Sequence, residues 1–556
     1  MIEISQIRMR CGGNPQEELR TQIRRILRLG REEDFTYRIV RHAVDARKKP
    51  ELYDVYSVRV ALSRNSRIPE ERLAERLHNR NVRIVREVPY VFPGPGAQAA
   101  VLPHRPVVVG FGPAGIFCAL MLARAGYRPI VFERGQRMEE RIGAVRSFWE
   151  GGALHPDSNI QFGEGGAGTF SDGKLNSNVK DPTGRIPAVL TAFVKAGAPE
   201  DIIYEQIPHI GTDRLRDVIR SLRQEILSLG GEIRFDTRVT ALCVRGGRLS
   251  GILYRPSGAP PAVPDEFLPC EALVLAPGHS ARDTIRTLHA QGIPMSSKPF
   301  AVGLRVSHPQ SLINFSQYGI SDPEEMRRLH LSPANYKLTA KTGDARGVYS
   351  FCMCPGGYVV NASSESGRLA VNGMSNYLRD SGRANSAIVI SINEQDFPKG
   401  DPVLAGMCFQ EQLEEKAYRL CGGRVPVQRF VSFEKGETDA RIPSEEELCI
   451  CGKSAPGALH TVLPENLTRD FVCAMHEFGR RIHGFDGEDA YVIGLESRTS
   501  SPVRILRDAA GESDVEGLYP CGEGAGYAGG ITSAAVDGIR AAECVARRFR
   551  PPADGS

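Results

Sequence analysis

The segment from Val107 to Gly135 constrains the fold of this chain more than any other; it reads VVVGFGPAGIFCALMLARAGYRPIVFERG. An apolar strand leads into Gly110, Gly112 and Gly115 in the spacing G-x-G-x-x-G, and an apolar helix and a second apolar strand follow. Such glycines permit a tight turn, a close approach of the backbone to a pyrophosphate and close packing of the helix on the strand. The segment therefore predicts a Rossmann-type βαβ unit that binds a dinucleotide.

The predicted turn and the strand after it supply the first candidate binding residues. The helix begins at Pro113 and Ala114, where free N–H groups and the positive end of the helix dipole attract phosphate. Glu133 ends the second strand and is placed to bind ribose hydroxyls, and Arg134 beside it is expected in the same site. Glycines that serve only a tight turn are the alternative, but they would leave the acidic strand end unexplained.

The segment from Gly517 to Glu543, GLYPCGEGAGYAGGITSAAVDGIRAAE, predicts a short strand, a glycine-rich turn and a helix. It resembles the C-terminal flavin motif of the glutathione-reductase-type flavoproteins, which implies FAD as the cofactor. In those proteins the turn meets the ribityl and pyrophosphate groups, and the helix N-terminus faces the flavin. That family usually has Asp in the turn, and Glu523 is one methylene longer but can still reach a ribityl hydroxyl. The matching residues here are Gly522, Glu523, Gly530, Ile531 and Thr532.

Two further segments resemble motifs of the same flavoproteins, in the same chain order. EALVLAPGHSARD is similar to their apolar strand that ends in Ala-Thr-Gly, with Ala276, Pro277 and Gly278 in those places. EIRFDTRVTALCV resembles the strand whose backbone contacts adenine, which makes Val239 the expected contact. The resemblance covers about residues 105–290 and 500–549.

A second G-x-G-x-x-G lies in QFGEGGAGTFSDGKL, residues 161–175. No apolar strand precedes it, so a second nucleotide domain is not expected there. In related flavoproteins a glycine-rich loop at a comparable place lies along the pyrophosphate and the flavin. The resemblance therefore implies that Gly165, Gly166 and Lys174 lie near the cofactor, and a plain surface turn is the alternative.

Three longer segments narrow the resemblance: NIQFGEGGAGTFSDGKLNS, GVYSFCMCPGGYVVNASSESGRLAVNGMSN and ESRTSSPVRI. Together with an α/β domain at the N-terminus, they resemble the family of uncharacterised bacterial FAD-dependent dehydrogenases, essentially from end to end. That resemblance implies a flavin-dependent oxidoreductase, and it names no substrate.

The first 92 residues predict a different kind of domain. Apolar and β-branched patterns place strands at 2–9, 35–44, 54–62 and 82–92 and helices at 15–29 and 69–77. This β-α-β-β-α-β order is that of a ferredoxin-like α+β domain. Residues 1–106 carry 21 Lys and Arg against 13 Asp and Glu, a net charge of +8, which is typical of a solvated surface or of a surface that meets an acidic partner. RNA binding is not expected, because no aromatic RNP-type sequence lies on the strands.

The chain of 556 residues is long enough for two to four packed domains of roughly 100–200 residues. We expect the ferredoxin-like domain at 1–92, a linker at 93–104, an FAD-binding domain of Rossmann type at 105–295 and 495–550, and a strand-rich substrate domain at 296–494. The 13 cysteines form no small disulfide framework, and MIEISQIRMR lacks the apolar core of a signal peptide, so a cytoplasmic location is expected. No segment reads as a membrane span.

Candidate catalytic residues are those that could line the exposed face of a flavin: Arg498, Tyr527 and Lys174. The fork of Arg498 would suit a substrate carboxylate, although each of the three has a structural role as its alternative. Two Cys-x-Cys pairs, Cys352/Cys354 and Cys449/Cys451, are interpreted as ordinary reduced cysteines, because no nearby Cys or His completes a zinc site. His155, His279 and His483 have no partner in the sequence pattern and are expected to be structural.

The sequence as a whole predicts an α/β flavoprotein that transfers hydride to or from FAD and acts on a small molecule. Because a second strand-linked dinucleotide motif is missing, NAD(P)H is expected only as a transient electron donor, and another electron carrier is the alternative. A flavin monooxygenase or oxidase remains open, as does a flavin-containing RNA- or protein-binding redox sensor.

Overall fold

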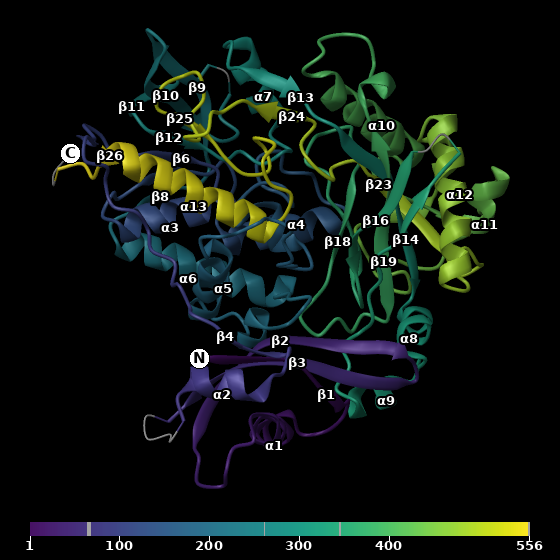
Figure 1. Ribbon diagram of the computed structural model, residues 1–556. Helices are drawn as coiled ribbons and strands as arrows, with labels where there is room; N and C mark the ends of the chain where they lie inside the picture. The colour runs from purple at the N-terminus through teal and green to yellow at the C-terminus, as the bar shows by residue number, and fades with distance from the viewer. Residues whose placement is uncertain (64–67, 261, 344–345, 554–556) are drawn as a thin grey trace.

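The computed structural model describes residues 1–63, 68–260, 262–343 and 346–553. The chain forms three units: an N-terminal one, one built on a parallel sheet and one built on a long-stranded sheet (Figure 1). The C-terminal part of the chain contributes to both of the larger units, since β23 lies in the long-stranded sheet and α13 packs on the parallel one (Figure 1). No helix in these described ranges is long and apolar enough to cross a membrane.

The N-terminal unit has a four-stranded antiparallel sheet in the order β2-β3-β1-β4 with two helices, which is the split βαβ arrangement. Helix α1 begins after Asn14, whose side chain caps the N–H of Gln16, and it buries Leu19, Ile23 and Leu27 at four-residue spacing. The last strand is shorter than its sequence pattern predicts, because β1 offers it no partner beyond Ile2. The elements are β1 (Ile2–Arg10), α1 (Pro15–Leu27), β2 (Phe35–Lys48), β3 (Glu51–Leu62), α2 (Glu70–Leu77) and β4 (Val82–Ile84).

The second unit is a five-stranded parallel sheet in the order β25-β12-β6-β7-β8. Alternate strand residues face opposite sides: Val108 packs toward helices α3, α6 and α13, whereas Val107 and Val109 pack toward the sheet β11-β10-β9 and α7. The parallel strands are β6 (Val107–Val109), β7 (Ile130–Phe132), β8 (Glu232–Arg234), β12 (Leu273–Leu275) and β25 (Leu518–Pro520). The other elements are α3 (Pro113–Arg124), α4 (Met138–Trp149), α5 (Arg185–Lys195), α6 (Thr212–Ser228), β9 (Thr237–Arg245), β10 (Arg248–Pro256), β11 (Glu266–Pro269), α7 (Arg282–Ala290) and α13 (Ile531–Arg548).

The third unit holds a seven-stranded sheet in the order β15-β16-β19-β14-β23-β20-β22, with α10 and α12 packed against its core. Its strands are β14 (Phe300–Pro309), β15 (Thr339–Lys341), β16 (Gly347–Cys354), β19 (Arg383–Ile392), β20 (Val425–Arg429), β22 (Ser454–Pro456) and β23 (Tyr491–Glu496). A smaller sheet is made by β17 (Tyr358–Asn361), β18 (Val371–Met374) and β21 (Ile450–Cys451). The helices are α8 (Gln310–Tyr318), α9 (Pro323–Arg328), α10 (Ala405–Cys421), α11 (Phe430–Lys435) and α12 (Glu465–Arg481).

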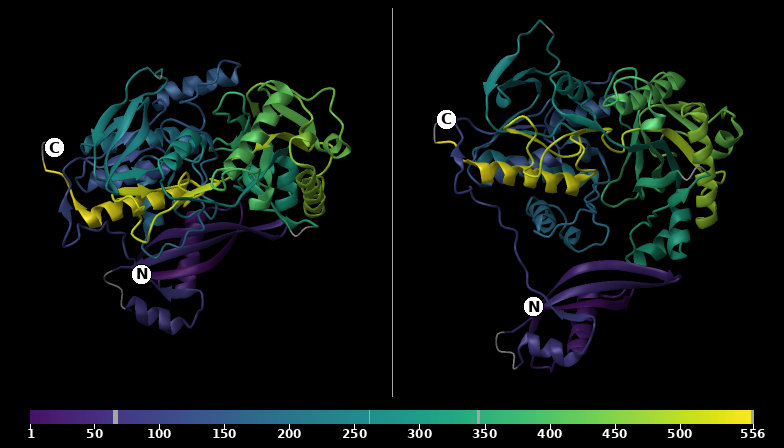
Figure 2. Two further views of the ribbon diagram at one scale, coloured as in Figure 1. Left: turned by 90° about the horizontal axis from the view of Figure 1, so that it is seen from above. Right: turned by 45° about the horizontal axis from the view of Figure 1, so that its top comes forward.

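Short strand pairs join distant parts of the chain. The segment 93–104, expected as a linker, leads from the N-terminal unit to the rest (Figure 2) and includes β5 (Ala100–Val101), which pairs with β26 (Phe549–Arg550). Strand β13 (Met295–Ser297) pairs with β24 (Val503–Ile505) where the second and third units meet. The pairing of β5 with β26 therefore fixes the C-terminal end of the linker to the second unit.

The N-terminal unit contacts both larger units. Leu52 packs with Ile320 and Met326 of the third unit. His42 on β2 contacts the second unit, since its Nδ1 lies 2.7 Å from Glu205 Oε1 while its Nε2 lies 2.9 Å from Asp54 Oδ1 within its own unit. Burial lowers the pKa of His42, but the hydrogen bonds to Asp54 and Glu205 outweigh it and raise the pKa to about 9.

We expect the docking of the N-terminal unit to weaken as the pH rises. Since the folded-state pKa of His42 is raised, its contribution is fully present below about pH 6.5 and is lost as the pH rises through about 9. A shift of this size corresponds to at most about 3 kcal/mol. Thermal unfolding between pH 6 and 10 should show that His42→Gln destabilises the protein at pH 6.5 but has little effect at pH 10. His483→Gln, an exposed control, should match the unchanged protein at both pH values, and equal losses for both variants would contradict this assignment.

Candidate functional site

A cavity of about 380 Å³ lies at the carboxyl ends of the parallel strands and reaches the third unit. One end is bounded by the turn after β6, by the ends of β7 and β12 and by the start of β9. The other end is bounded by Lys174 and by Cys352, Asn372 and Glu496 of the third unit. Ligands of open α/β sheets bind at this edge of the strands, so the position is the one that a nucleotide would take.

The glycine turn after β6 is fixed by close backbone contacts. Gly110 has φ +97°, and a Cβ there would lie 2.1 Å from the carbonyl oxygen of Ala276. A Cβ on Gly115 would lie 1.9 Å from the carbonyl oxygen of Gly110, so this residue serves helix packing and does not line the cavity. A Cβ on Gly112 would meet nothing nearer than Gly166 Cα at 3.8 Å and would occupy the cavity instead.

Two helix N-termini face the cavity. Helix α3 starts after Gly112 and α13 after Gly530, and among the described residues no side chain caps either start. Ile531 lines the cavity, whereas Thr532 points away from it and donates its hydroxyl hydrogen to the carbonyl of Leu175 at 2.8 Å. Free N–H groups and the helix dipole at both places suit negatively charged ligand groups.

Glu133 holds the glycine turn in place. Its carboxylate accepts hydrogen bonds from the backbone N–H groups of Phe111 at 2.8 Å and of Gly135 and Gly163 at 2.9 Å. The side chain is buried and lines the cavity, so its remaining acceptor capacity is available to a ribose hydroxyl. Arg134 beside it also lines the cavity, with its guanidinium bonded to Asp283 at 3.0 Å.

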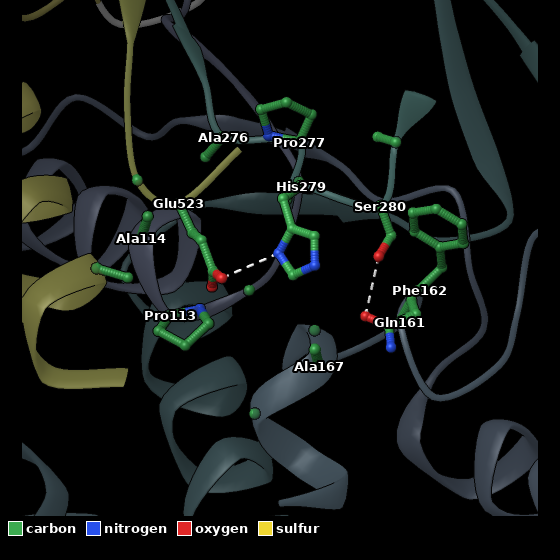
Figure 3. A pocket seen from close by; sticks show the side chains of 18 of the residues that line it. Pro113, Ala114, Gln161, Phe162, Ala167, Ala276, Pro277, His279, Ser280 and Glu523 are labelled. Carbon is green, nitrogen blue, oxygen red and sulfur yellow. Dashed lines mark hydrogen bonds and ion pairs between the residues drawn. The ribbon is translucent and has the colours of Figure 1, made fainter. Parts of the chain in front are cut away.

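The turn near Glu523 contains a histidine–glutamate contact that the sequence pattern did not indicate. His279 Nδ1 lies 2.9 Å from Glu523 Oε1, and both side chains line the cavity (Figure 3). The expectation that His279 has no partner was therefore wrong. Its other ring nitrogen, Nε2, is buried with no hydrogen-bond partner among the described residues. A buried ring nitrogen without a partner at a cavity wall is a group that a polar ligand would satisfy.

The residues present fit an FAD. The glycine cradle and the α3 start suit a pyrophosphate, the α13 start suits the flavin pyrimidine ring, and His279 offers a free polar atom between them. Most of the residues expected at the cofactor line the cavity: Gly110, Gly112, Pro113, Ala114, Glu133, Arg134, Gly166, Val239, Ala276, Gly278, Gly522, Glu523, Gly530 and Ile531.

Three residues expected at the cofactor do not line the cavity: Gly115, Gly165 and Thr532. Gly165 packs inward, where a Cβ would lie 2.1 Å from Thr169 Oγ1, and its N–H donates to the carbonyl of Phe111. Loop glycines of this kind are needed for packing below the site, and sequence spacing does not distinguish them from glycines that face a ligand.

Lys174, a candidate from the sequence, lines the far end of the cavity. Its Nζ is 3.4 Å from Asp172 Oδ2 and 3.8 Å from Cys354 Sγ. Asp172 is buried and also pairs with Arg379 at 2.6 Å. Burial lowers the pKa of Lys174, but the charges of Asp172 and of the thiols of Cys354 and Cys352 outweigh it, and the net pKa is raised. The ammonium group therefore stays charged at neutral pH.

Glu496 stands at the same end and was not among the candidates from the sequence. It is 2% exposed and lines the cavity, and its Oε2 lies 3.0 Å from Arg305 Nη2. Burial raises the pKa of Glu496 to about 7, although Arg305 opposes this shift. A carboxyl group that titrates near neutral pH can both accept and donate a proton. Glu496 is the last residue of an otherwise apolar strand, β23, and this position is the signal that could have identified it.

Arg498 does not serve as a free clamp for a substrate carboxylate. Its Nε and Nη2 donate to the two oxygens of Glu414 at 3.0 and 2.9 Å, and its Nη1 donates to Ser280 and Ser364. Its fork is thus occupied by a buried carboxylate from the third unit, even though the residue borders the cavity. The sequence could not show this, because Glu414 lies 84 positions away.

Tyr527, a catalytic candidate from the sequence, does not line the cavity. Its side chain lies outside the cavity, its hydroxyl donates to the carbonyl of Ile505 at 3.0 Å, and the Arg507 guanidinium lies 3.7 Å from its ring centre. The tyrosine therefore anchors the turn between β25 and α13 to strand β24.

Two family models match parts of the chain, and a relative matches most of it. Residues 299–499 match the family model described as FAD-dependent protein, C-terminal domain-like, and residues 1–61 match a domain of unknown function (DUF8436). The chain is 43% identical over 540 residues to an uncharacterised protein of Clostridium beijerinckii, which covers 96% of each chain.

Solved flavoprotein structures are similar at low level. The flavin-dependent brominase Bmp2 matches with a TM-score of 0.35 and 12% identity, over 80% of this chain and 78% of its own. The glycine oxidase of Bacillus cereus matches with a TM-score of 0.35 and 10% identity, over 80% and 97%. The glycerol-3-phosphate dehydrogenase of Bacillus halodurans, complexed with FAD, matches with a TM-score of 0.34 and 12% identity, over 81% and 64%. Scores this low support no argument about the reaction.

We expect Gly112→Ala to weaken cofactor binding while keeping the fold. The added methyl group meets no protein atom closer than 3.8 Å but fills the space that a pyrophosphate would approach. The affinity for FAD, measured by fluorescence titration of the apoprotein, should fall at least about tenfold, which is about 1.4 kcal/mol. The melting temperature of the apoprotein should change little.

Gly143→Ala is the matched control, since a Cβ there also meets nothing within 4 Å but lies on an exposed part of α4. Unchanged FAD affinity in Gly112→Ala would place the pyrophosphate elsewhere.

Proposed function

This chain belongs to the same family as the uncharacterised Clostridium beijerinckii protein, and on that premise we propose that it is an FAD-dependent oxidoreductase that transfers hydride to or from the flavin. One observation carries the proposal. A single cavity runs from a dinucleotide-type glycine turn to titratable side chains of the third unit, so that a cofactor and a substrate can meet inside it. Within the flavoproteins we assign the chain to the glutathione-reductase type, on the basis of its four matching motifs.

The cofactor would be held mainly by backbone groups. The starts of α3 and α13 would receive its negative charges, while Glu133 and His279 would bond its hydroxyl groups. FAD supplies two-electron redox chemistry when bound. The protein's own part is to orient the reactants, to exclude water with the third unit and to move a proton.

Glu496 is the residue best placed to hold or release that proton. It lines the cavity at the end opposite the adenosine side, and its pKa of about 7 allows both protonation states at neutral pH. Arg305 fixes its orientation through Nε and Nη2 contacts of 3.1 and 3.0 Å. Lys174 contributes a positive charge at the same end, which suits a substrate that is anionic or becomes so.

The electron donor of the flavin is a separate part of the proposal. We propose NAD(P)H as a transient donor that would enter from the third unit, with another electron carrier as the second candidate. Anaerobic mixing of the FAD-bound protein with NADH and with NADPH separates them, because rapid bleaching of the flavin absorbance indicates a nicotinamide-linked reductase. Absence of bleaching with both would favour reduction by the substrate itself. Fast reoxidation on admission of air would favour an oxidase or monooxygenase.

We expect Glu496→Gln to change the flavin midpoint potential only at higher pH. Below about pH 6 Glu496 is protonated and neutral like Gln, so the two proteins should agree. At pH 8 its negative charge disfavours added electrons, so the variant should have the higher potential, by on the order of 30 mV, which is a tenfold change in the equilibrium constant of a two-electron couple. Reductive titration with reference dyes measures this. Glu477→Gln, an exposed control, should show no difference, and a pH-independent shift in Glu496→Gln would exclude the proton role.

A further inference from the structure

The end of strand β16 carries an arrangement that the proposed function does not use. Phe351 pairs with Ala387 of β19 and Cys354 pairs with Asn385, so one extra residue is accommodated between them. At this bulge Cys352 adopts φ +47°, a conformation that residues with side chains rarely adopt. Such strained residues concentrate at functional sites, because the surrounding structure must hold them in place.

The bulge brings the two thiols together beside the cavity. Cys352 lines the cavity and Cys354 is buried directly behind it. The thiol of Cys354 donates a hydrogen bond to the carbonyl oxygen of Cys352 at 3.3 Å. Two cysteines two apart on a strand have Cα atoms at most about 7 Å apart, which is close to the range that a disulfide spans.

Charged groups surround the pair on several sides. Lys174 Nζ lies 3.8 Å from Cys354 Sγ, and Arg305 Nη1 donates to the carbonyl of Cys352 at 3.3 Å. Asp172 and Glu496 add negative charge, and each is itself paired with an arginine. The hydrogen bond from Cys354 and the charges of Lys174 and Arg305 lower the pKa of the Cys352 thiol, whereas the pKa of Cys354 is raised by the hydrogen bond to Cys352 and by burial. One thiolate and one thiol is the state in which a dithiol reacts.

We propose that Cys352 and Cys354 are a redox-active dithiol that reduces a small disulfide at the end of the cavity. The proposal names a substrate class for the oxidoreductase proposed above, and it rests on that function for its supply of electrons. Three observations support the proposal: Cys352 lines the cavity, the bulge places Cys352 and Cys354 next to each other, and Lys174 lies beside them.

The reaction is balanced as thiol–disulfide exchange. The Cys352 thiolate attacks one sulfur of the substrate disulfide, whose S–S bond breaks, and the first substrate thiolate leaves and takes up a proton. The Cys354 thiol then loses its proton and attacks Cys352 Sγ, which forms the intramolecular disulfide and releases the second substrate thiol. The thiolate and the thiol of the protein lose two electrons and one proton, and the substrate gains these two electrons, that proton and a second proton from the solvent. Two electrons and one proton from the reduced cofactor return the disulfide to the thiolate and the thiol.

The chain contains a matched control pair. Cys449 and Cys451 have the same Cys-x-Cys spacing, and Cys449 also has positive φ, at +53°. Neither lines the cavity. Burial raises the pKa of both thiols, that of Cys451 to about 12. These cysteines should therefore remain unreactive under conditions in which Cys352 reacts.

The first experiment treats the full-length FAD-bound protein with hydroxyethyl disulfide without oxygen, followed by acid quenching, alkylation and peptide mass analysis. The peptide that contains Cys352 and Cys354 should lose two hydrogens and resist alkylation. The same peptide should react in the same way in the control double variant Cys449→Ser/Cys451→Ser.

Cys354→Ser should accumulate the mixed disulfide of Cys352 with the probe. Lys174→Met should slow alkylation of Cys352 at pH 7 by about tenfold, because the thiolate loses its positive neighbour. Full alkylation of both thiols after probe treatment would overturn the proposal.

The second experiment separates this proposal from the flavin function. Anaerobic dithionite titration of the probe-oxidised protein should consume four electrons per FAD, and two in Cys352→Ser. If the unchanged protein consumes only two electrons per FAD, Cys352 and Cys354 are not a redox-active dithiol. That result would not contradict the proposed flavin function. If the protein binds no FAD, the flavin function fails, while disulfide formation in the first experiment still decides the role of the thiols.

Discussion

The site depends on one buried carboxylate. Glu414 on α10 has no exposed surface, and its two oxygens are each bonded by Arg282 on α7, at 2.8 Å, and by Arg498 after β23, at 3.0 and 2.9 Å. Burial would raise the pKa of Glu414, but the two arginines hold it well below its usual range. Removing any member would leave a buried charge without its partner, which is costly. The network therefore fixes the third unit on the second and sets the distance across the cavity.

That network also determines which charges a substrate can meet. Arg498 borders the cavity but is bonded to Glu414, so its charge is already balanced. Lys174 shares the carboxylate of Asp172 with Arg379, so two positive charges face one negative charge, and Lys174 also reaches toward the thiols. The far end of the cavity therefore keeps a positive charge beside the thiols, which favours a thiolate there.

The sequence predicted more of the glycine-turn end of the cavity than of the opposite end. Gly110, Gly112 and Glu133 belong to one local strand–turn–helix–strand segment, so their relative positions follow from spacing alone. At the opposite end the sequence indicated Lys174 but neither Cys352 nor Glu496. The pairing of β16, β19, β14 and β23 holds these two in one sheet, and the packing of the second unit on the third brings Lys174 to the same end of the cavity. Tyr527 fails as a candidate for a related reason: its motif fixes the turn, but packing against Arg507 decides where its side chain points.

The sequence by itself determined the local elements. The periodicity of apolar residues dictated the strands and helices of the N-terminal unit, and the glycine spacing dictated the nucleotide turn, because both depend on interactions between residues close in the chain. Tertiary structure alone decided which charges are available. The pairing of Arg498 with Glu414, of His279 with Glu523 and of Lys174 with the thiols depends on long-range contacts. The charge state of a buried group is set by its neighbours in space, and residues far apart in the sequence supply those neighbours.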